Sequence, residues 1–236
     1  MKDRLVLFDI DGTLLRCGKV WIECYLESVR EEFPNWEMPQ VSFGGKTDHW
    51  IARELITAQF GGREPGDLEP IATRIVSRYL QKVRSHREGR VMSEVRVLPG
   101  AEKLLEALAA EKRVALSVLT GNMREGASLK LEVAGLLPAL DLELGAFGSD
   151  HWQRSRLPEI AVSRALERLG REFRGREIVI IGDTVHDITC GRHLGVKTIG
   201  VGTGHDECRA PMLAEKPDHF FEDLTDSDAV LAAILG

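Results

Sequence analysis

The sequence lacks the long apolar runs and the basic clusters that mark membrane and nucleic-acid-binding proteins. No stretch of its 236 residues approaches the ~20 apolar residues that a membrane-spanning helix needs. The net charge is −6 and no lysine-rich run occurs, so we expect no binding to nucleic acid through phosphate contacts. With 43% hydrophobic and 29% charged residues, the composition is typical of a soluble globular protein of one large or two smaller domains.

Cysteine is also scarce. The chain has Cys17, Cys24, Cys190 and Cys208, with no C-x-x-C pair and no zinc-binding spacing. Scattered thiols in a chain of this size indicate a reducing compartment. The four apolar residues that follow the charged start of the chain are too few for the core of a signal peptide, so we expect a cytoplasmic protein.

Two glycine-containing segments do not complete a nucleotide-binding motif. Gly45-Lys46-Thr47 ends like a P-loop, but Gln40 stands where the first glycine belongs and no strand precedes it. The segment 200–204 follows an expected strand, yet it lacks the spacing of a dinucleotide-binding G-x-G-x-x-G motif. Neither segment therefore predicts a nucleotide site.

The segment that carries most information begins at the N-terminus. Four apolar residues, 5–8, run directly into Asp9, and Asp11 follows two positions later. A short apolar run is typical of a buried strand in a parallel sheet, and residues two apart in an extended chain point the same way. Because unpaired buried charge is unfavourable, the two carboxylates indicate a cation or a reacting group beyond the strand. The alternative is a pair of solvated acids in an Asp-Gly turn.

The rest of the chain divides into a helical part and an alternating part. From residue 16 to 92 the apolar spacing predicts helices and no strand, with Thr47 as an N-cap. Beyond it, strands and helices alternate, which favours an α/β fold with a doubly wound, Rossmann-like parallel sheet. We expect a catalytic core of residues 1–15 and 93–236, with 16–92 as an inserted helical cap domain. The expected helices cover 19–33, 47–61, 67–87, 101–112, 124–134, 158–169 and 185–194, with one more at the C-terminus, and the later strands 114–119, 140–147, 178–181, 196–201 and 218–221.

Polar residues follow two of the later strands. Thr120-Gly121-Asn122 places a hydroxyl and backbone N–H groups before a helix, which can cradle an anion. Simple N-capping by Thr120 or Asn122 is the alternative. Asp183 ends the most apolar strand and Asp187 lies one helical turn on, so their carboxylates suit Mg²⁺. For Asp187, an acid favoured by the helix dipole is the alternative.

Two arginines precede the helix expected at 158–169. A cation at Arg154 or Arg156 could neutralise a phosphate or orient a nucleophile. The alternative is that both are exposed loop residues.

Taken together, these motifs resemble the haloacid dehalogenase-like hydrolase superfamily, over the whole chain. They are Asp9-Ile10-Asp11-Gly12-Thr13-Leu14, Leu119-Thr120-Gly121-Asn122, a basic residue before a helix, and Gly182-Asp183-x-x-x-Asp187. The helical insertion directly after the first motif resembles the cap of the branch that holds phosphoglycolate phosphatases and β-phosphoglucomutases.

The resemblance implies a role for each matching residue. Asp9 would be the nucleophile that forms an aspartyl-phosphate, and Asp11 the general acid for the leaving alcohol and then the base for water. Mg²⁺ would be held by the side chains of Asp9 and Asp183 and by the backbone carbonyl of Asp11. The remaining implied roles are phosphoryl binding by Thr120, Gly121 and Asn122, and support of the metal shell by Asp187.

In one position the sequence departs from the family pattern. The family most often has a lysine before a proline-containing helix start, whereas this chain offers Arg154, with Arg156 as the second candidate. Family dehalogenases lack an acid at the position of Asp11, so its presence favours phosphate esters as substrates. The loop with Gly45, Lys46 and Thr47 matches the region where relatives contact the leaving group, and capping of the next helix by Thr47 is the alternative.

The sequence thus predicts an enzyme, a Mg²⁺-dependent phosphatase acting on a small phosphorylated metabolite that resembles phosphoglycolate or a sugar phosphate. The alternatives are a sugar-phosphate mutase of the same superfamily and a non-catalytic phosphate- or protein-binding module. We expect neither nucleic-acid nor membrane partners, and make no prediction of the oligomeric state.

Overall fold

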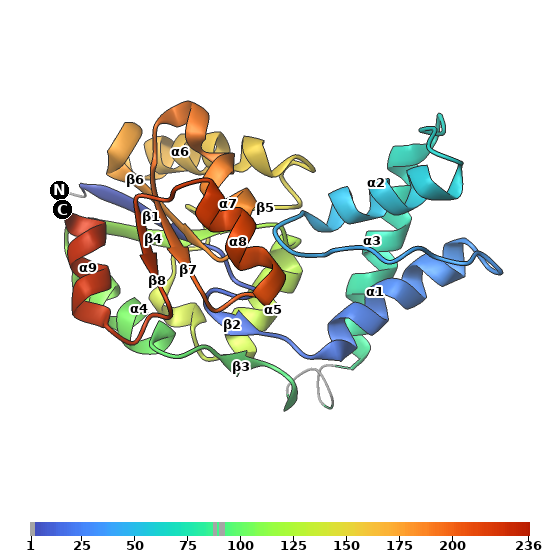
Figure 1. Ribbon diagram of the computed structural model, residues 1–236, viewed down its shortest axis with the longest axis horizontal. Helices are drawn as coiled ribbons and strands as arrows, with labels where there is room; N and C mark the ends of the chain where they lie inside the picture. The colour runs from blue at the N-terminus through green and yellow to red at the C-terminus, as the bar shows by residue number, and fades with distance from the viewer. Residues whose placement is uncertain (1–2, 87–88, 90–92) are drawn as a thin grey trace.

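The core of the molecule is a parallel sheet. The structure, a computed structural model, describes residues 3–86, 89 and 93–236. Within these residues, six strands lie in the order β5-β4-β1-β6-β7-β8 (Figure 1). The strands are β1 (Arg4–Phe8), β4 (Val114–Thr120), β5 (Ala146–Phe147), β6 (Ile178–Gly182), β7 (Lys197–Val201) and β8 (His219–Phe221).

Strand β1 occupies the middle of this sheet. It pairs in parallel with β4 on one side and β6 on the other, with Leu5 opposite Ala115 and Ile178. Parallel strands end at the same edge, so the residues that follow β1, β4 and β6 come together there.

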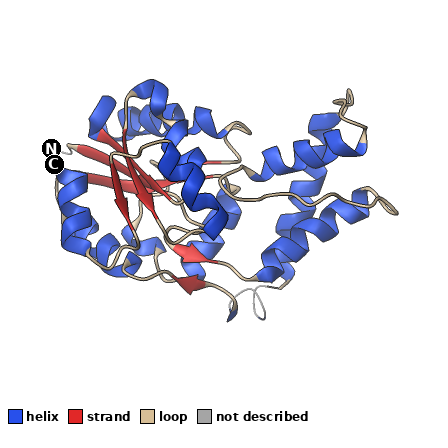
Figure 2. Cartoon of the chain, in the orientation of Figure 1, coloured by secondary structure: helices blue, strands red, loops and turns tan. Residues whose placement is uncertain are grey.

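Helices cover both faces of the sheet, as expected for a doubly wound fold (Figure 2). Apolar residues of α4 (Ala101–Ala110), α5 (Arg124–Val133) and α9 (Ser227–Leu235) pack on one face. Those of α6 (Leu157–Leu169) and α7 (Val185–Cys190) pack on the other. The sequence-based prediction of the α/β fold class is therefore confirmed.

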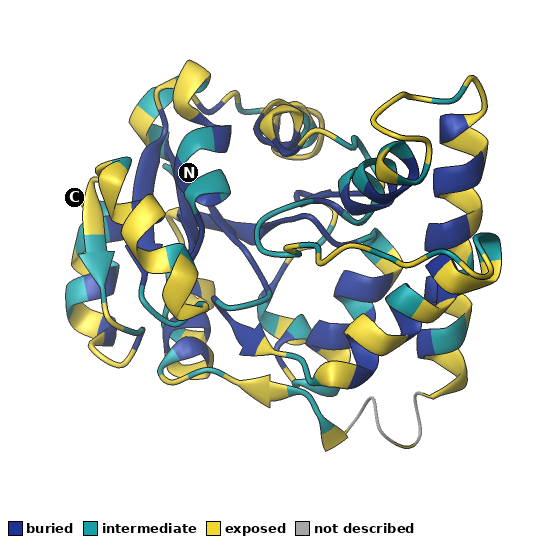
Figure 3. Ribbon diagram, turned by 45° about the vertical axis from the view of Figure 1, so that its right-hand side comes forward, coloured by how far each residue is buried: buried dark blue, intermediate teal, exposed yellow. Residues whose placement is uncertain are grey.

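The expected helical insertion stands beside the sheet (Figure 1). It consists of α1 (Lys19–Glu32), α2 (Asp48–Gln59) and α3 (Leu68–Ser85), whose apolar faces meet in a separate cluster (Figure 3). Thr47 caps α2, because its side-chain oxygen accepts a hydrogen bond from the backbone N–H of Trp50 at 3.0 Å. We refer to α1–α3 and their connecting loops as the cap, and the domain boundaries expected from the sequence stay a prediction.

A short ribbon joins the cap to the core. Strand β2 (Leu15–Arg16) pairs antiparallel with β3 (Arg96–Val97), so the two connections lie side by side. The sequence-based expectation of no strand from residue 16 to 92 is thus wrong at Arg16. Two-residue strands are too short to give a periodic signal.

Three further elements differ from the expectation. The strand expected at 140–147 is limited to Ala146–Phe147, because Leu140 and Leu144 are both buried and turns, not a strand, connect them. The helix expected at 185–194 ends at Cys190, and a separate 3₁₀ turn follows at Arg192–Leu194. Helix α8 (Asp206–Ala214) was not expected.

The ends of the remaining helices agree closely with the expected ones. Helix α3 ends at Ser85, while its expected end at residue 87 lies outside the described residues. Within the described part of the chain, no helix combines the length and the apolar character needed to cross a membrane.

Candidate active site

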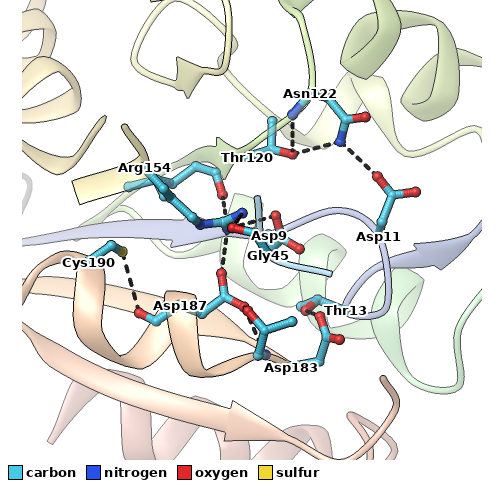
Figure 4. A network of polar contacts seen from close by, with 12 residues as sticks. Asp9, Asp11, Thr13, Gly45, Thr120, Asn122, Arg154, Asp183, Asp187 and Cys190 are labelled. Carbon is cyan, nitrogen blue, oxygen red and sulfur yellow. Dashed lines mark hydrogen bonds and ion pairs between the residues drawn. The ribbon is translucent and has the colours of Figure 1, made fainter. Parts of the chain in front are cut away.

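The predicted site residues converge at the carboxyl edge of the three central strands. Asp9 follows β1, Thr120 ends β4, and Asp183 follows β6 (Figure 4). All three are buried, at the point where the sheet faces the cap. The structure therefore brings together motifs that lie far apart in the sequence.

Three carboxylates form a buried acidic cluster. One oxygen each of Asp9, Asp183 and Asp187 lies within 4.8 Å of the others. Asp187 accepts hydrogen bonds from the backbone N–H and the hydroxyl of Thr184, at 2.9 and 2.7 Å, and Thr13 donates to Asp183 at 3.0 Å. Oxygen atoms in this number and proximity suit a hard cation such as Mg²⁺ or Ca²⁺.

Arg154 is the cation that contacts this cluster. Its guanidinium donates to Asp9 Oδ1 at 2.9 Å and also to Asp187, and the side chain is buried. It further donates to the backbone carbonyl oxygens of Leu119 and Gly45, each at 3.2 Å. One guanidinium faces three carboxylates, so the cluster keeps an excess of negative charge that a metal ion can balance.

Arg156 lies elsewhere. It is exposed and pairs with Glu159 on the surface at 3.5 Å. The difference arises because both residues belong to one 3₁₀ turn, Arg154–Arg156, which directs the first side chain inward and leaves the last one outside. Of the two arginines, only Arg154 contacts Asp9 among the contacts of the described residues.

The pKa values of Asp9 and Asp183 reflect first the burial of the cluster and then the charges around it. Burial raises the pKa of Asp9 to about 7, with Arg154 lowering it and Asp187 raising it. Burial and the neighbouring Asp187 and Asp9 also raise the pKa of Asp183 well above its ordinary value. Without a metal ion, the cluster therefore tends to retain protons.

Asp11 belongs to a second group of contacts in the same cavity. Its Oδ2 accepts hydrogen bonds from Asn122 Nδ2 at 2.7 Å and from Lys130 Nζ at 2.6 Å. Burial opposes its charge, but Lys130 and Asn122 outweigh this and hold the pKa of Asp11 below its ordinary value. The expectation that Asp9 and Asp11 face one cavity is confirmed, since both line it.

A glycine is required directly after Asp11. Gly12 has φ of +89°, a conformation that L side chains rarely adopt. A Cβ at this position would lie 2.5 Å from Asp183 Oδ2. The Asp-Gly dipeptide therefore lets the chain pass close to the acidic cluster.

The predicted anion cradle follows β4 and contacts Asp11 through Asn122. The hydroxyl oxygen of Thr120 accepts hydrogen bonds from the backbone N–H and the side-chain amide of Asn122, at 3.3 and 2.7 Å. Gly121 packs directly against the cap, since a Cβ there would lie 2.0 Å from the carbonyl oxygen of Lys46. The loop after β4 thus lines the cavity and also packs against the cap.

The predicted cap residues lie against the core on this side. The Thr47 hydroxyl donates to the carbonyl oxygen of Trp152 at 2.6 Å, and the backbone N–H of Asp48 donates to that of Gly121 at 2.9 Å. Lys46 Nζ forms an ion pair with Glu54 at 2.5 Å. Gly45 and Lys46 line the cavity, whereas Thr47 fastens the loop to the core.

A cavity of about 170 Å³ connects the acidic cluster to the cap. Sequence reasoning missed several of its lining residues. The aromatic ones lie at helical spacing and resembled ordinary packing residues, and a buried lysine gives no sequence signal. The missed residues include Trp21, Tyr25, Tyr79 and Lys130.

Comparisons with known proteins agree with this geometry. Residues 6–201 match the family of haloacid dehalogenase-like hydrolases. Pyrophosphatase PpaX of Anoxybacillus flavithermus is 24% identical over 236 residues, which cover 100% of this chain and 98% of that protein. A hydrolase from Pseudomonas syringae has a similar fold, with a TM-score of 0.70, 18% identity and 98% of each chain covered. A predicted phosphoglycolate phosphatase from Haemophilus somnus also has a similar fold, with a TM-score of 0.65, 19% identity and 98% of each chain covered. Since the family match spans most of the sequence, the chain belongs to the haloacid dehalogenase-like hydrolases.

Proposed function

We propose that this protein is a Mg²⁺-dependent phosphatase that hydrolyses a small phosphorylated metabolite through an aspartyl-phosphate on Asp9. The observation that carries the proposal is the position of Asp9. It directly follows the central strand, accepts a hydrogen bond from Arg154, belongs to the acidic cluster with Asp183 and Asp187, and lines the cavity. Asp11 lines the same cavity from the side of Asn122 and Lys130.

The donor set fits Mg²⁺. The side chains of Asp9 and Asp183 and the backbone carbonyl of Asp11 would hold the ion, with Asp187 supporting them. The excess of buried negative charge supports this assignment, because it would otherwise oppose both folding and the approach of a phosphate. When bound, Mg²⁺ supplies the positive charge that allows a phosphate dianion to reach a carboxylate.

The residues of the chain account for the two chemical steps. A carboxylate oxygen of Asp9 attacks phosphorus, and the bond between phosphorus and the leaving oxygen breaks. The negative charge of the bound phosphate raises the pKa of Asp11, so Asp11 takes up a proton when the substrate binds and gives it to the leaving oxygen. The Thr120 hydroxyl and the backbone N–H groups of Gly121 and Asn122 bind the phosphoryl oxygens. Water then attacks phosphorus, Asp11 takes its proton, and inorganic phosphate leaves Asp9.

Arg154 would assist the first step by orienting the Asp9 carboxylate. Its hydrogen bond to Asp9 Oδ1 fixes one carboxylate oxygen. The other oxygen then remains for attack, in a geometry that needs little reorganisation. We assign Arg154, not Arg156, to the basic position of the family.

The cavity favours a small leaving group. Its volume is about 170 Å³, and Lys46 and Gly45 of the cap line it opposite the acidic cluster. Phosphoglycolate and sugar phosphates are therefore the first candidates. Pyrophosphate is a further one, because relatives at 24% identity carry the name pyrophosphatase.

A substrate panel tests the proposal. Wild-type protein and Asp9→Asn would be incubated with Mg²⁺ and with phosphoglycolate, several sugar phosphates and pyrophosphate, and released phosphate would be measured. We expect release by the wild type and loss of it in the variant, which keeps the shape of the side chain. Isomerised sugar phosphate without phosphate release would instead indicate the mutase. Full turnover by Asp9→Asn would refute both mechanisms, and no turnover on any ester would favour a binding module.

A further inference from the structure

A buried lysine contacts the proposed proton-transfer residue. Lys130 lies on α5 with 4% of its surface exposed. Its Nζ donates to Asp11 Oδ2 at 2.6 Å and to Asn122 Oδ1 at 2.7 Å. Burying an ammonium group is unfavourable unless it is paired and hydrogen-bonded, so these contacts need an explanation beyond packing.

The three side chains form a closed ring of hydrogen bonds. Lys130 donates to Asp11 and to Asn122, and the Asn122 amide nitrogen donates to Asp11 at 2.7 Å. The amide also donates to the Thr120 hydroxyl at 2.7 Å, which ties the ring to the end of β4. In such a ring each member restricts the other two, so the Asp11 carboxylate has a fixed orientation although its side chain is partly exposed to the cavity.

The ring also touches the cap. Lys130 Nζ lies 4.7 Å from the ring centroid of Trp21, a residue of α1 in the cap. A cation over an aromatic face is attracted to it, and more strongly so when water is excluded. Lys130 thus links the position of Asp11 to the presence of the cap above it.

We propose that Lys130 is a positioning residue that holds the Asp11 carboxylate at the cavity for the water-activating step. The inference rests on the proposed phosphatase function. In that step the water oxygen attacks the phosphorus of the aspartyl-phosphate and Asp11 takes a proton from the water. The bond between phosphorus and Asp9 breaks, which releases inorganic phosphate and restores the Asp9 carboxylate. Lys130 exchanges no proton and acts only through Asp11.

The first experiment separates the two chemical steps. With p-nitrophenyl phosphate the leaving group needs no proton, so in Lys130→Met the first step should proceed. We expect a burst of about one nitrophenolate per enzyme, followed by steady turnover that is lower than wild type by on the order of 10- to 100-fold. A merely structural role would reduce the burst together with the turnover.

Lys197 provides a matched control. It is also a buried lysine, with 3% of its surface exposed, and its Nζ donates to the carbonyl oxygen of Ala233 at 2.9 Å, outside the cavity. Lys197→Met should change thermal stability without changing the ratio of burst to steady turnover. If it changed this ratio as Lys130→Met does, the proposed link to Asp11 would be wrong.

A double-mutant cycle tests whether Lys130 acts through Asp11. In an Asp11→Asn background, Lys130→Met should cause no further loss of steady turnover, because the carboxylate it positions is absent. If Lys130→Met lowered the turnover of Asp11→Asn by the same factor as it lowers that of the wild type, the inference would be overturned. Should Lys130→Met fail to fold, Lys130→Gln carries the same cycle, since its amide keeps a polar group at this buried position but has neither the charge nor the reach of the ammonium group that contacts Asp11.

The outcome for the wild type separates this inference from the proposed function. If the wild-type protein hydrolyses none of the esters, the phosphatase function itself fails. If it hydrolyses them and Lys130→Met and Lys130→Gln turn over at the wild-type rate, only the role of Lys130 fails.

Discussion

The raised pKa of Asp9 predicts that its carboxylate destabilises the metal-free protein at neutral and alkaline pH. The folded-state pKa is about 7, compared with an ordinary value of 3.8. The loss of folding stability caused by ionising Asp9 is absent below about pH 4, because Asp9 is protonated in both the folded and the unfolded chain. It is complete above about pH 7, where Asp9 is ionised in both states. Stability from this group therefore falls as the pH rises from 4 to 7.

The size of the effect follows from the shift. A rise of the Asp9 pKa from 3.8 to about 7 corresponds to about 4 kcal/mol, because one pKa unit is worth about 1.4 kcal/mol. Asp9→Asn removes the charge and keeps an oxygen that can accept from Arg154. In EDTA, we expect the variant to be more stable than the wild type, by a margin that widens by about 3 kcal/mol from pH 4.5 to 8. In thermal unfolding this corresponds to about 6–12 °C.

The assay is urea unfolding followed by the fluorescence of the four tryptophans, at pH 4.5 and 8. Saturating Mg²⁺ should narrow or reverse the margin at pH 8, because the ion binds the wild-type carboxylate more strongly than the amide. Asp11→Asn is a control of opposite sign. The pKa of Asp11 is lowered, so its charge stabilises the protein above about pH 4 and the variant should be less stable at pH 8. A margin for Asp9→Asn that is equal at both pH values, or negative at pH 8 in EDTA, would refute the reasoning.

Three further predictions concern the arginines and the cap. Arg154→Ala should lower kcat by on the order of 100- to 1000-fold, whereas Arg156→Ala should leave it within about twofold, since exposed ion pairs contribute little; equal losses would contradict the assignment. Thr47→Ala should lower the free energy of unfolding by about 1–2 kcal/mol, measured by urea titration, because α2 loses its N-cap; an unchanged value would mean the cap bond contributes nothing. Gly121→Ala should fold, as judged by circular dichroism, but lower kcat/KM by on the order of 100-fold, because its Cβ meets the carbonyl of Lys46; wild-type kinetics would show that this contact does not position the cap.

The sequence predicted the residues at the ends of the central strands because their signal is local. An apolar run followed by Asp9, and another followed by Asp183, mark both the strand and the point where it ends. Asp9, Thr120 and Asp183 all lie at such ends, so predicting the strands also located these three residues. The order of the strands in the sheet was not predicted and comes from the structure.

The elements that were missed depend on contacts between distant residues. Lys130 lies between Leu129 and Leu131 in a helix, a place where a lysine is usually solvated, and its partner Asp11 is 119 residues away. The alternating residues at 140–145 have the pattern of a strand, yet the backbone N–H of Asp141 bonds to Leu116 and the Ser117 hydroxyl donates to the carbonyl of Asp141. Only the folded chain supplies these partners.

The ribbon of β2 and β3 has a consequence for the architecture of the chain as a whole. The polypeptide leaves the core at Leu15 and Arg16 and returns at Arg96 and Val97, opposite the same residues. The cap is therefore inserted into the core like one long surface loop, whose two ends are held together by the ribbon. Lengthening or exchanging such a loop adds little to the entropic cost of closing it. Two adjacent strands also resist twisting more than one linker does, so the cap is expected to tilt about the ribbon as one body instead of swivelling freely. Because the chain leaves and re-enters the core through the paired strands β2 and β3, the core can accept different caps without a change in the sheet or in the acids at its edge.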